Sequence, residues 1–435
     1  MSRTAAAPSD THVDTHVVTL PNGLRAVTIP LPWRQTVSLS VFVRTGSLHE
    51  PARLNGISHV VEHMAFKGTT TRDCQRINLD AERLGAEVNA YTDKDHTAFH
   101  IEGLARDLDA FVPLLADIVL NSTFPAEELE RERQVILHEF TEVQEDPAAV
   151  AFQLFDRACY GTHPAGQPVI GQRANIQRIK RADLLGYVKR QYTAANVVVA
   201  AAGPIKPRAF VRAVEAAFGA MPAGEASRVA PPTWLGGLKQ RRLPGSSQCH
   251  AVLGFAAPAL GDDRHIAYVL AAALLGEGMS SPLLDQIRER RGLAYYVGCS
   301  ADVGPLAGQF VIDAATAPGQ ADELLTEVAR LLHQQAVSGP DPVGLERARQ
   351  QLTVRALRAL EQPARRLENA AQDLFTLGRL RDTNAWLAQL DAVTPRQVRA
   401  VFKRMLAGPA AIALAGSVPA KARAQVERLF GGGWQ

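Results

Sequence analysis

The sequence predicts an α+β protein of two homologous domains, each a mostly antiparallel sheet with helices packed on one face. Two observations lead to this prediction. In the first half, strand-like segments come first and helix-like segments follow, a grouping typical of α+β domains. The second half then repeats several features of the first. A doubly wound parallel sheet would need regular alternation of strands and helices, and no glycine-rich phosphate loop is present.

The elements of the first half follow from its hydrophobic pattern. Asn22-Gly23 suits a hairpin turn between the first two strand-like segments. Helical periodicity then replaces the strand pattern. The expected strands are 17–20, 24–29, 37–44 and 196–202, and the expected helices are 55–67, 76–84, 104–120 and 126–144.

The repeat is clearest in one hexamer. Residues 129–134 read Leu-Glu-Arg-Glu-Arg-Gln, and residues 345–350 read Leu-Glu-Arg-Ala-Arg-Gln. Each copy follows a proline, Pro125 or Pro342, that suits the first turn of a helix. Both halves also close with a helix, a short apolar strand and a glycine. We therefore expect a first domain at 11–220, a proline- and glycine-rich linker at 221–242, and a second domain at 243–431.

Composition limits the classes of function. The 435 residues are 46% hydrophobic and 21% charged, which is ordinary for a folded protein with a large core. The net charge is only +3 and no basic stripe is present, so we expect no nucleic-acid partner. No apolar run is long enough to span a membrane, and the first 18 residues lack an apolar signal core. Four widely spaced cysteines suggest core thiols, and we expect a cytoplasmic protein.

One segment carries the residues for chemistry. Residues 55–64 read Asn-Gly-Ile-Ser-His-Val-Val-Glu-His-Met, with a helical pattern around them. On a helix, His59 and His63 lie one turn apart on one face, as two imidazoles that share a cation must. Glu62 flanks the same face, where a carboxylate can accept a proton from a water bound to that cation. The order His-x-x-Glu-His inverts the commoner His-Glu-x-x-His while it keeps two ligands and one base.

A catalytic zinc needs a third protein ligand. Glu132 and Glu139 lie two turns apart on the expected helix 126–144, so one can bind the metal while the other holds an imidazole. A merely solvated acidic helix is the competing interpretation. The repeat favours a metal site, because Ala348 and Arg355 stand at the matching positions and the stretch matching the histidines, 267–275, offers no ligand.

These motifs resemble the inverted-motif peptidases that include pitrilysin, insulysin and the mitochondrial processing peptidase. The matching segments are His-Val-Val-Glu-His-Met-Ala-Phe-Lys-Gly-Thr at 59–69 and Glu-Arg-Glu-Arg-Gln-Val-Ile-Leu-His-Glu at 130–139, and the similarity covers nearly the whole chain. The resemblance implies a short, two-domain, bacterial-type member. It implies one Zn²⁺ per chain, bound by His59, His63 and Glu139, with Glu62 as general base and Glu132 supporting an imidazole.

The resemblance also implies a substrate site. The segment Gly85–Thr92 matches the family's active-site edge strand, so Asn89, Ala90 and Tyr91 are expected to bind the peptide. Arg288 and Tyr295 match an arginine–tyrosine pair that binds a substrate carbonyl and stabilises the oxyanion. We expect a zinc endopeptidase acting on peptides or unfolded segments. The alternative is a catalytically silent core subunit of a larger complex. The expected assembly is a homodimer or, as an alternative, a heterodimer with a related chain.

Overall fold

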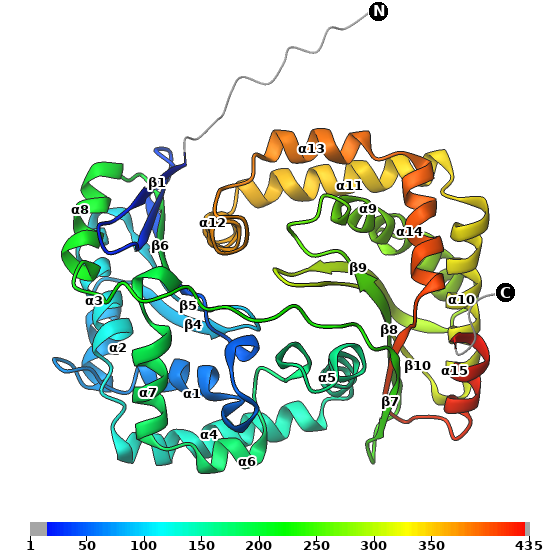
Figure 1. Ribbon diagram of the computed structural model, residues 1–435, viewed down its shortest axis with the longest axis horizontal. Coiled ribbons are helices and arrows are strands. Elements are labelled where there is room, and N and C mark those ends of the chain that lie inside the picture. The colour runs from blue at the N-terminus through cyan, green and yellow to red at the C-terminus, as the bar shows by residue number, and fades with distance from the viewer. Residues whose placement is uncertain (1–14, 431–435) are drawn as a thin grey trace, which may run out of the picture.

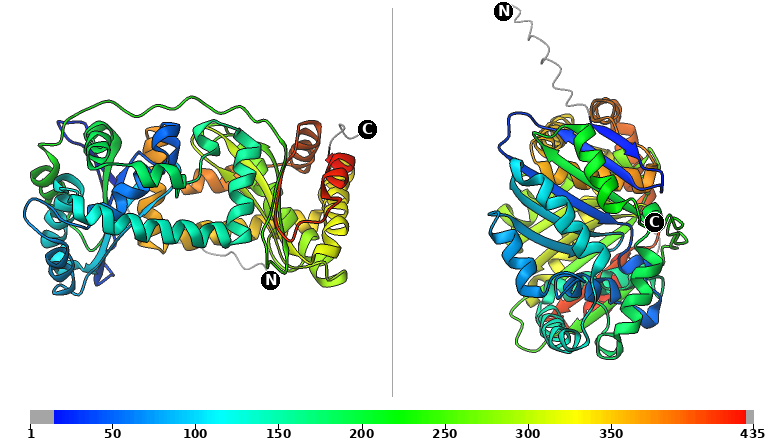
Figure 2. Two further views of the ribbon diagram at one scale, coloured as in Figure 1. Left: turned by 90° about the horizontal axis from the view of Figure 1, so that it is seen from below. Right: turned by 90° about the vertical axis from the view of Figure 1, so that its left-hand side faces the viewer.

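The computed structural model describes residues 15–430, so residues 11–14 and 431 of the expected domains lie outside it. The chain forms two halves, each with its own sheet and a layer of helices (Figure 1). An extended segment runs along one side of the molecule and joins them (Figure 2). Within the described residues no helix has both the length and the apolarity of a membrane span.

The first half contains a six-stranded sheet in the order β1-β2-β6-β3-β5-β4. Only β2 and β6 pair in parallel, and the expected turn at Asn22-Gly23 joins β1 to β2 as an antiparallel hairpin. The strand β4 therefore forms one edge of this sheet. The strands are β1 (His16–Thr19), β2 (Arg25–Pro30), β3 (Thr36–Val43), β4 (Glu87–Thr92), β5 (Thr97–Leu104) and β6 (Val197–Gly203).

The helices of the first half bury their apolar side chains against one face of this sheet, in one continuous core. The helix expected from residue 104 begins at Leu108, because β5 continues to Leu104 and a short 3₁₀ turn follows it. The helices of this layer are α1 (Ile57–Ala65), α2 (Cys74–Glu82), α3 (Leu108–Asn121), α4 (Ala126–Glu145), α6 (Arg173–Arg178), α7 (Arg181–Gln191) and α8 (Pro207–Phe218).

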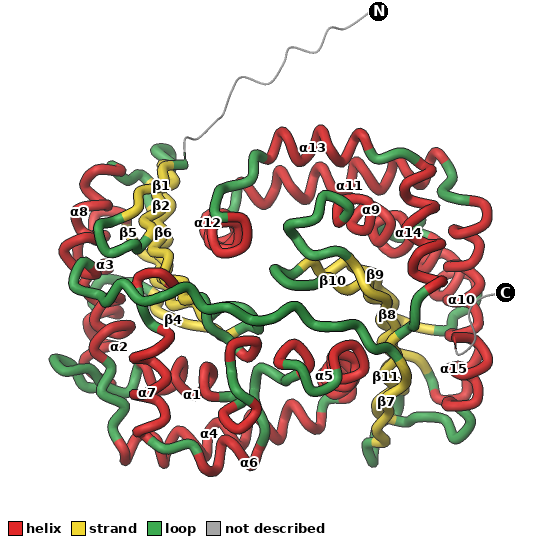
Figure 3. The backbone as a smooth tube through the Cα atoms, in the orientation of Figure 1, coloured by secondary structure: helices red, strands yellow, loops and turns green. Residues whose placement is uncertain are grey.

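The second half repeats the plan with five strands in the order β7-β11-β8-β10-β9. Its strands are β7 (Gly237–Arg242), β8 (Cys249–Ala257), β9 (Ala294–Val303), β10 (Gly308–Thr316) and β11 (Ala411–Gly416), and β9 forms an edge (Figure 3). Its helices are α9 (His265–Gly276), α10 (Ala321–Ser338), α11 (Pro342–Leu360), α13 (Thr383–Ala392), α14 (Pro395–Ala407) and α15 (Ala422–Phe430). A π-helical turn, η6 (Leu284–Arg290), precedes β9.

The predicted end of the linker at residue 242 is wrong. Residues 237–242 form β7, which pairs in parallel with β11 and so belongs to the second sheet. The strand is polar and mostly exposed, so its hydrophobic pattern gives no signal. The α+β class and the duplicated architecture are confirmed.

The two halves exchange one helix each. Helix α5 (Pro147–Tyr160) follows α4 in the chain but packs on the second sheet, where Phe155 contacts the core formed with β8, β10 and β11. Helix α12 (Pro363–Leu377) follows α11 and packs on the first sheet. The Arg25 guanidinium donates to the Leu374 carbonyl at 2.7 Å and lies 5.5 Å from the Phe375 ring centroid. Each sheet therefore has its second face covered by the other half.

Candidate active site

Helix α1 begins at a buried carboxylate that the sequence analysis did not identify. Glu50 is 1% exposed and accepts hydrogen bonds from the backbone N–H groups of Gly56 at 2.7 Å and Ser58 at 2.8 Å. It also accepts one from the Asn55 side chain at 2.9 Å. A carboxylate at this position accepts hydrogen bonds from N–H groups of the first turn that have no partner within the helix. Its negative charge is also stabilised by the positive end of the helix dipole. Gly56 has φ +101°, and a Cβ there would lie 2.8 Å from the Gly171 Cα, so the entry into α1 requires glycine.

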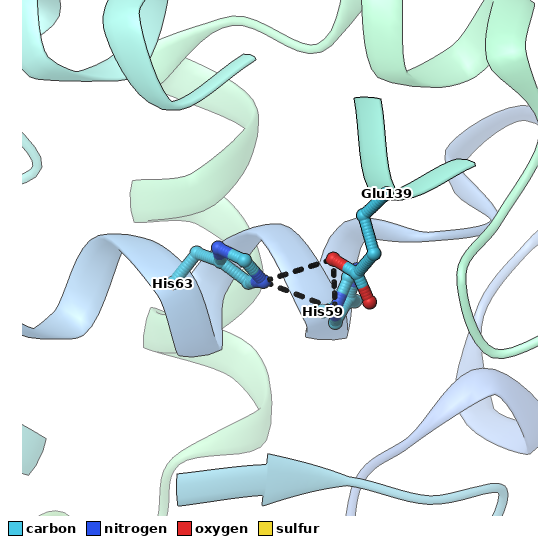
Figure 4. Close-up of side chains that lie close together, drawn as sticks. All are labelled: His59, His63 and Glu139. Carbon is cyan, nitrogen blue, oxygen red and sulfur yellow. Dashed lines mark hydrogen bonds and ion pairs between the residues drawn. The ribbon is translucent and has the colours of Figure 1, made fainter. Parts of the chain in front are cut away.

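Three of the predicted residues converge on one point (Figure 4). His59 and His63 come from successive turns of α1, and Glu139 comes from α4, which packs beside it. The Nε2 atoms of the two histidines are 3.1 Å apart. One carboxylate oxygen of Glu139 lies 3.5 Å from each of these nitrogens. Two nitrogens and one oxygen thus form a nearly equilateral triangle.

This triangle has the size that a tetrahedral zinc requires. Zinc–nitrogen bonds of about 2.0–2.1 Å place neighbouring ligand atoms roughly 3.3–3.4 Å apart in a tetrahedron. The observed edges of 3.1, 3.5 and 3.5 Å bracket that value. Three ligands leave the fourth position open, which distinguishes catalytic from structural zinc sites. The donor set therefore fits a catalytic zinc.

Glu132 supports one of the imidazoles. Its carboxylate lies 2.8 Å from Nδ1 of His63. A proton held on Nδ1 by this contact leaves Nε2 free to bind a cation. Lys67 in turn pairs with the other Glu132 oxygen at 2.7 Å. The sequence gives no signal for this contact, because the spacing between Lys67 and Glu132 does not indicate that the two side chains meet.

The surrounding groups shift the pKa values of the two imidazoles in opposite directions. Burial lowers the pKa of His59, and the charge of His63 lowers it further. Burial also opposes the charged form of His63, but its hydrogen bonds to the carboxylates of Glu132 and Glu139 outweigh burial and raise the pKa of His63.

Glu62 lies beside the triangle without being part of it. Thr92, the last residue of β4, donates its hydroxyl to the Glu62 carboxylate at 2.8 Å. Burial raises the pKa of Glu62, and the Thr92 hydrogen bond opposes that rise. Thr92 was not assigned in the sequence, where it is separated from Glu62 by thirty residues. It fixes the carboxylate at the end of the edge strand.

A cavity of about 510 Å³ surrounds these groups. Ala90 and Tyr91 line it, as does Thr92, so β4 forms one wall. Asn89 does not line this cavity, because its side chain lies on the opposite face of β4, among residues that face α12. The lining residues are His59, Glu62, His63, Ala90, Tyr91, Thr92, Lys94, Glu139, Val143, Phe152, Gln153, Asp156, Pro168, Val169 and Ile170.

Arg288 and Tyr295 lie together in the second half, away from this cavity. The Arg288 guanidinium lies 5.1 Å from the Tyr295 ring centroid, a cation–π contact. Tyr295 is 81% exposed at the start of the edge strand β9. Neither residue lines the cavity around His59. The two residues are therefore adjacent to each other but do not complete the site within one chain.

Comparison with known proteins identifies the class of protein. The family described as Insulinase (Peptidase family M16) matches residues 25–173, which contain the whole His59 cluster. The family described as Peptidase M16 inactive domain matches residues 178–352, which contain Arg288 and Tyr295. An uncharacterized zinc protease of Mycobacterium tuberculosis is 33% identical over 424 residues, which cover 94% of this chain and 96% of that protein. The chain belongs to the M16 family of peptidases, as a short bacterial-type member.

Other relatives agree with this assignment. The uncharacterized zinc protease YmxG of Bacillus subtilis is 29% identical, and the match covers 92% of this chain and 98% of that protein. Two solved structures have the same fold with a TM-score of 0.85 each. A protease from Helicobacter pylori is 21% identical over 92% of this chain and 99% of that chain. A peptidase M16 inactive domain from Pseudomonas fluorescens is 23% identical over 93% and 98%.

Proposed function

We propose that this protein is a zinc-dependent endopeptidase that hydrolyses peptides or unfolded segments. The observation that carries the proposal is the triangle formed by His59, His63 and Glu139, with the buried Glu62 carboxylate beside it. Bound zinc would polarise the scissile carbonyl and lower the pKa of water. The relatives named zinc proteases agree with this choice of metal.

The side chains of this chain would divide the remaining work. Glu62 accepts a proton from the attacking water and passes it to the leaving nitrogen. Thr92 holds the Glu62 carboxylate in place through its 2.8 Å hydrogen bond. Glu132 keeps the proton of His63 on Nδ1, and Lys67 orients Glu132. All four roles can be tested without a bound substrate structure.

The strand β4 is the proposed binding site for the peptide backbone. Because β4 is an edge strand, one side of its backbone has no strand partner in the first sheet. An extended peptide can add to that side through main-chain hydrogen bonds, which depend little on sequence. The wall formed by Ala90 and Tyr91 then places the peptide next to the triangle. Asn89 would contact side chains on the opposite face of the added strand.

The first experiment measures metal content and peptide cleavage in one preparation. The purified full chain should hold about one zinc per chain by atomic absorption and cleave a quenched fluorescent peptide. Glu62→Gln should keep the zinc and lose hydrolysis by a factor of about 10² to 10⁴, because it removes only the base. Full activity of Glu62→Gln would contradict the general-base role. A zinc-free, inactive wild-type chain would favour the alternative, a silent core subunit.

We propose that a second copy completes each site. The support is that Arg288 and Tyr295 lie outside the cavity of their own chain and that Tyr295 is 81% exposed. In a symmetric dimer, each copy would offer its pair to the zinc of the other. Arg288 would bind a substrate carbonyl and Tyr295 would stabilise the oxyanion.

Subunit exchange tests this arrangement. Glu62→Gln and Tyr295→Phe should each be nearly inactive alone. A mixture that exchanges subunits should regain activity, because one site in the mixed dimer is intact. Arg241→Gln, an exposed change in β7, serves as the control that should complement neither variant beyond simple mixing. An inactive mixture, despite mixed dimers seen by native mass spectrometry, would rule out the shared site. A heterodimer with a related chain would show as an inactive protein when this chain is made alone.

A reducing compartment suits the chain. All four cysteines, Cys74, Cys159, Cys249 and Cys299, are free thiols. Proteins of the cytoplasm keep their thiols reduced, so we propose a cytoplasmic location.

A further inference from the structure

A second cavity lies on the face of β4 opposite the cluster of His59, His63 and Glu139. Its volume is about 700 Å³, and its lining includes residues of the first sheet and of α12, which the second half supplies. The antiparallel pairing of β4 with β5 places two pairs of lining residues directly opposite each other, Glu87 with Glu102 and Asn89 with His100. The lining residues are Ser40, Phe42, Asn78, Ala81, Glu82, Ala86, Glu87, Val88, Asn89, Tyr91, Ala98, His100, Glu102, Ala364 and Glu368.

This cavity is negatively charged. Four carboxylates line it, and no lysine or arginine does. Glu368 pairs with Arg365 at 3.0 Å, and Glu102 accepts only the Ser38 hydroxyl. Between residues 15 and 430, neither Glu82 nor Glu87 forms an ion pair. The cavity therefore holds more negative charge than its own neighbours neutralise.

The hydroxyl of Ser40 also faces this cavity. Ser40 is 6% exposed and forms no side-chain hydrogen bond with any described residue. Burial lowers the pKa of His100, which lies opposite Ser40 in the sheet. The Ser40 hydroxyl and a neutral imidazole can each accept a hydrogen bond from a donor outside the chain.

The lining selects an organic cation over a metal ion. No three of the carboxylates and imidazoles that line this cavity bring ligand atoms within metal-binding distance of one another, since among the described residues only His59, His63 and Glu139 form such a group. Phe42 and Ala98 give the cavity an apolar floor. Lysine and arginine side chains place their methylene stems on such surfaces and their charged ends on polar groups.

We propose that this cavity binds a lysine or arginine side chain of the peptide substrate and so sets a preference for cationic peptides. The inference rests on the proposed function, because it takes β4 as the peptide-binding strand. Side chains of an added strand alternate between its two faces. Those on the face of Thr92 lie toward Glu62, and those on the other face enter this cavity.

The position of the cationic residue follows from the same register. Thr92 is level with Glu62, whereas Glu87 lies five residues earlier in β4. At about 3.3 Å per residue, Glu87 and the paired Glu102 lie roughly 17 Å along the strand from Thr92. The preferred lysine or arginine therefore lies up to about five residues from the cleaved bond.

The test uses peptides that differ at one position. Lysine, glutamine or glutamate is placed in turn at each of five positions on either side of the bond, and kcat/KM is measured with the zinc-loaded full chain. Lysine should exceed glutamine, and glutamine should exceed glutamate, by a factor of about 2 to 5 per charge at low salt. The double variant Glu87→Gln, Glu102→Gln should lose this preference. Glu215→Gln, an exposed change on α8, is the matched control and should keep it.

Binding separates this proposal from the proposed function. Labelled peptides are titrated into the Glu62→Gln variant, and fluorescence anisotropy gives their affinities without hydrolysis. Tighter binding of the lysine peptide, lost in the Glu87→Gln, Glu102→Gln background, supports the proposal even if no variant cleaves peptide. Equal affinities and equal kcat/KM for the three peptides would overturn it while leaving the peptidase intact. A charge preference that survives in the double variant would overturn it as well.

Discussion

The two halves share a scaffold but differ at the position of the candidate metal site. Five strands of the first sheet, β2-β6-β3-β5-β4, correspond in order to β7-β11-β8-β10-β9, including the one parallel pair. Helices α1 and α4 correspond to α9 and α11. Between α1 and α4 lie two histidines and two glutamates. Between α9 and α11 lie apolar side chains, with Ala348 fully buried at the position of Glu132.

An ion pair replaces the cluster in the second half. Arg355, at the position of Glu139, pairs with Glu277 just after α9, at 3.1 Å. Arg347 donates to the Leu274 carbonyl at 2.7 Å and further ties the two helices. The helix pair is thus held together without a metal. The comparison teaches that the scaffold does not depend on a cation, so changes at the first-half cluster should affect metal and activity more than folding.

The largest expected effect comes from substituting Glu139, with its counterpart in the second half, Arg355, as the matched control. Glu139→Gln should lose zinc and reduce peptide cleavage by about 10³ or more, because it removes the only carboxylate of the triangle. Arg355→Gln, its counterpart, should keep both zinc and activity. Zinc is measured by atomic absorption and cleavage with a quenched peptide. Both variants should unfold within about 1 kcal/mol of the metal-free wild type. Equal losses of zinc and of peptide cleavage in the two variants would contradict the assignment of Glu139 as a metal ligand.

The exchanged helices give the next effect. Phe155 of α5 is 1% exposed against the second sheet, and Leu374 of α12 is 4% exposed against the first. Phe155→Ala should cost about 3–5 kcal/mol and Leu374→Ala about 2–5 kcal/mol in the free energy of unfolding. Because each helix connects the two halves, one unfolding transition should shift in both variants.

Two probes check that coupling. Far-UV circular dichroism follows both halves, and tryptophan fluorescence includes Trp234, whose ring lies 6.4 Å from that of Phe155. The exposed change Val135→Ala on α4 is the control and should shift neither probe. Two separate transitions in Phe155→Ala, with one half unchanged, would show that the halves fold independently.

The support of His63 ranks third. Glu132→Gln should weaken zinc affinity by a factor of about 10 to 100, as changes behind a metal ligand do. The counterpart Ala348→Ser should leave zinc affinity unchanged, since no metal group lies there. Competition with a chelator measures both. A loss for Glu132→Gln equal to that for Glu139→Gln would mean that their roles are reversed.

The sequence predicts the triangle well and its surroundings poorly. The spacing of His59 and His63 on one helix, with Glu139 chosen as third ligand from the resemblance, identifies a cluster that the structure brings together. Thr92 and Lys67 reach the cluster through contacts between separate elements, which no local periodicity encodes. Substrate roles for Asn89, Arg288 and Tyr295 remain predictions.

The exchange of α5 and α12 also has no signal in the sequence. Each helix is amphipathic, and amphipathicity indicates that one face is buried without indicating which sheet buries it. The strand β7 is not predicted from the sequence, because it is an edge strand that lies mostly in solvent and has no apolar face. The duplicated hexamer was informative for the opposite reason, because both of its copies form helices in equivalent positions.

The smallest effect concerns acid stability, where the two halves use the same device. Asp117 on α3 accepts hydrogen bonds from Thr69 at 2.7 Å and from Arg72 at 2.6 Å, while Glu327 on α10 pairs with Arg291 at 2.6 Å. Burial opposes the charge of Asp117, but these donors outweigh it and lower its pKa, and hydrogen bonds from Arg330 lower the pKa of Glu327. A lowered folded-state pKa gives stability that is complete above the ordinary carboxylate pKa and is lost as the pH falls through the folded value.

Asp117→Asn should therefore lower the free energy of unfolding by about 1–3 kcal/mol at pH 7. Between about pH 5 and 3, the variant should lose less of its remaining stability than the wild type loses. Urea unfolding of the metal-free protein across this range measures how the free energy of unfolding changes with pH. Glu215→Gln, an exposed change, is the control and should match the wild type. The same pH dependence in Asp117→Asn as in the wild type would contradict a lowered pKa of Asp117.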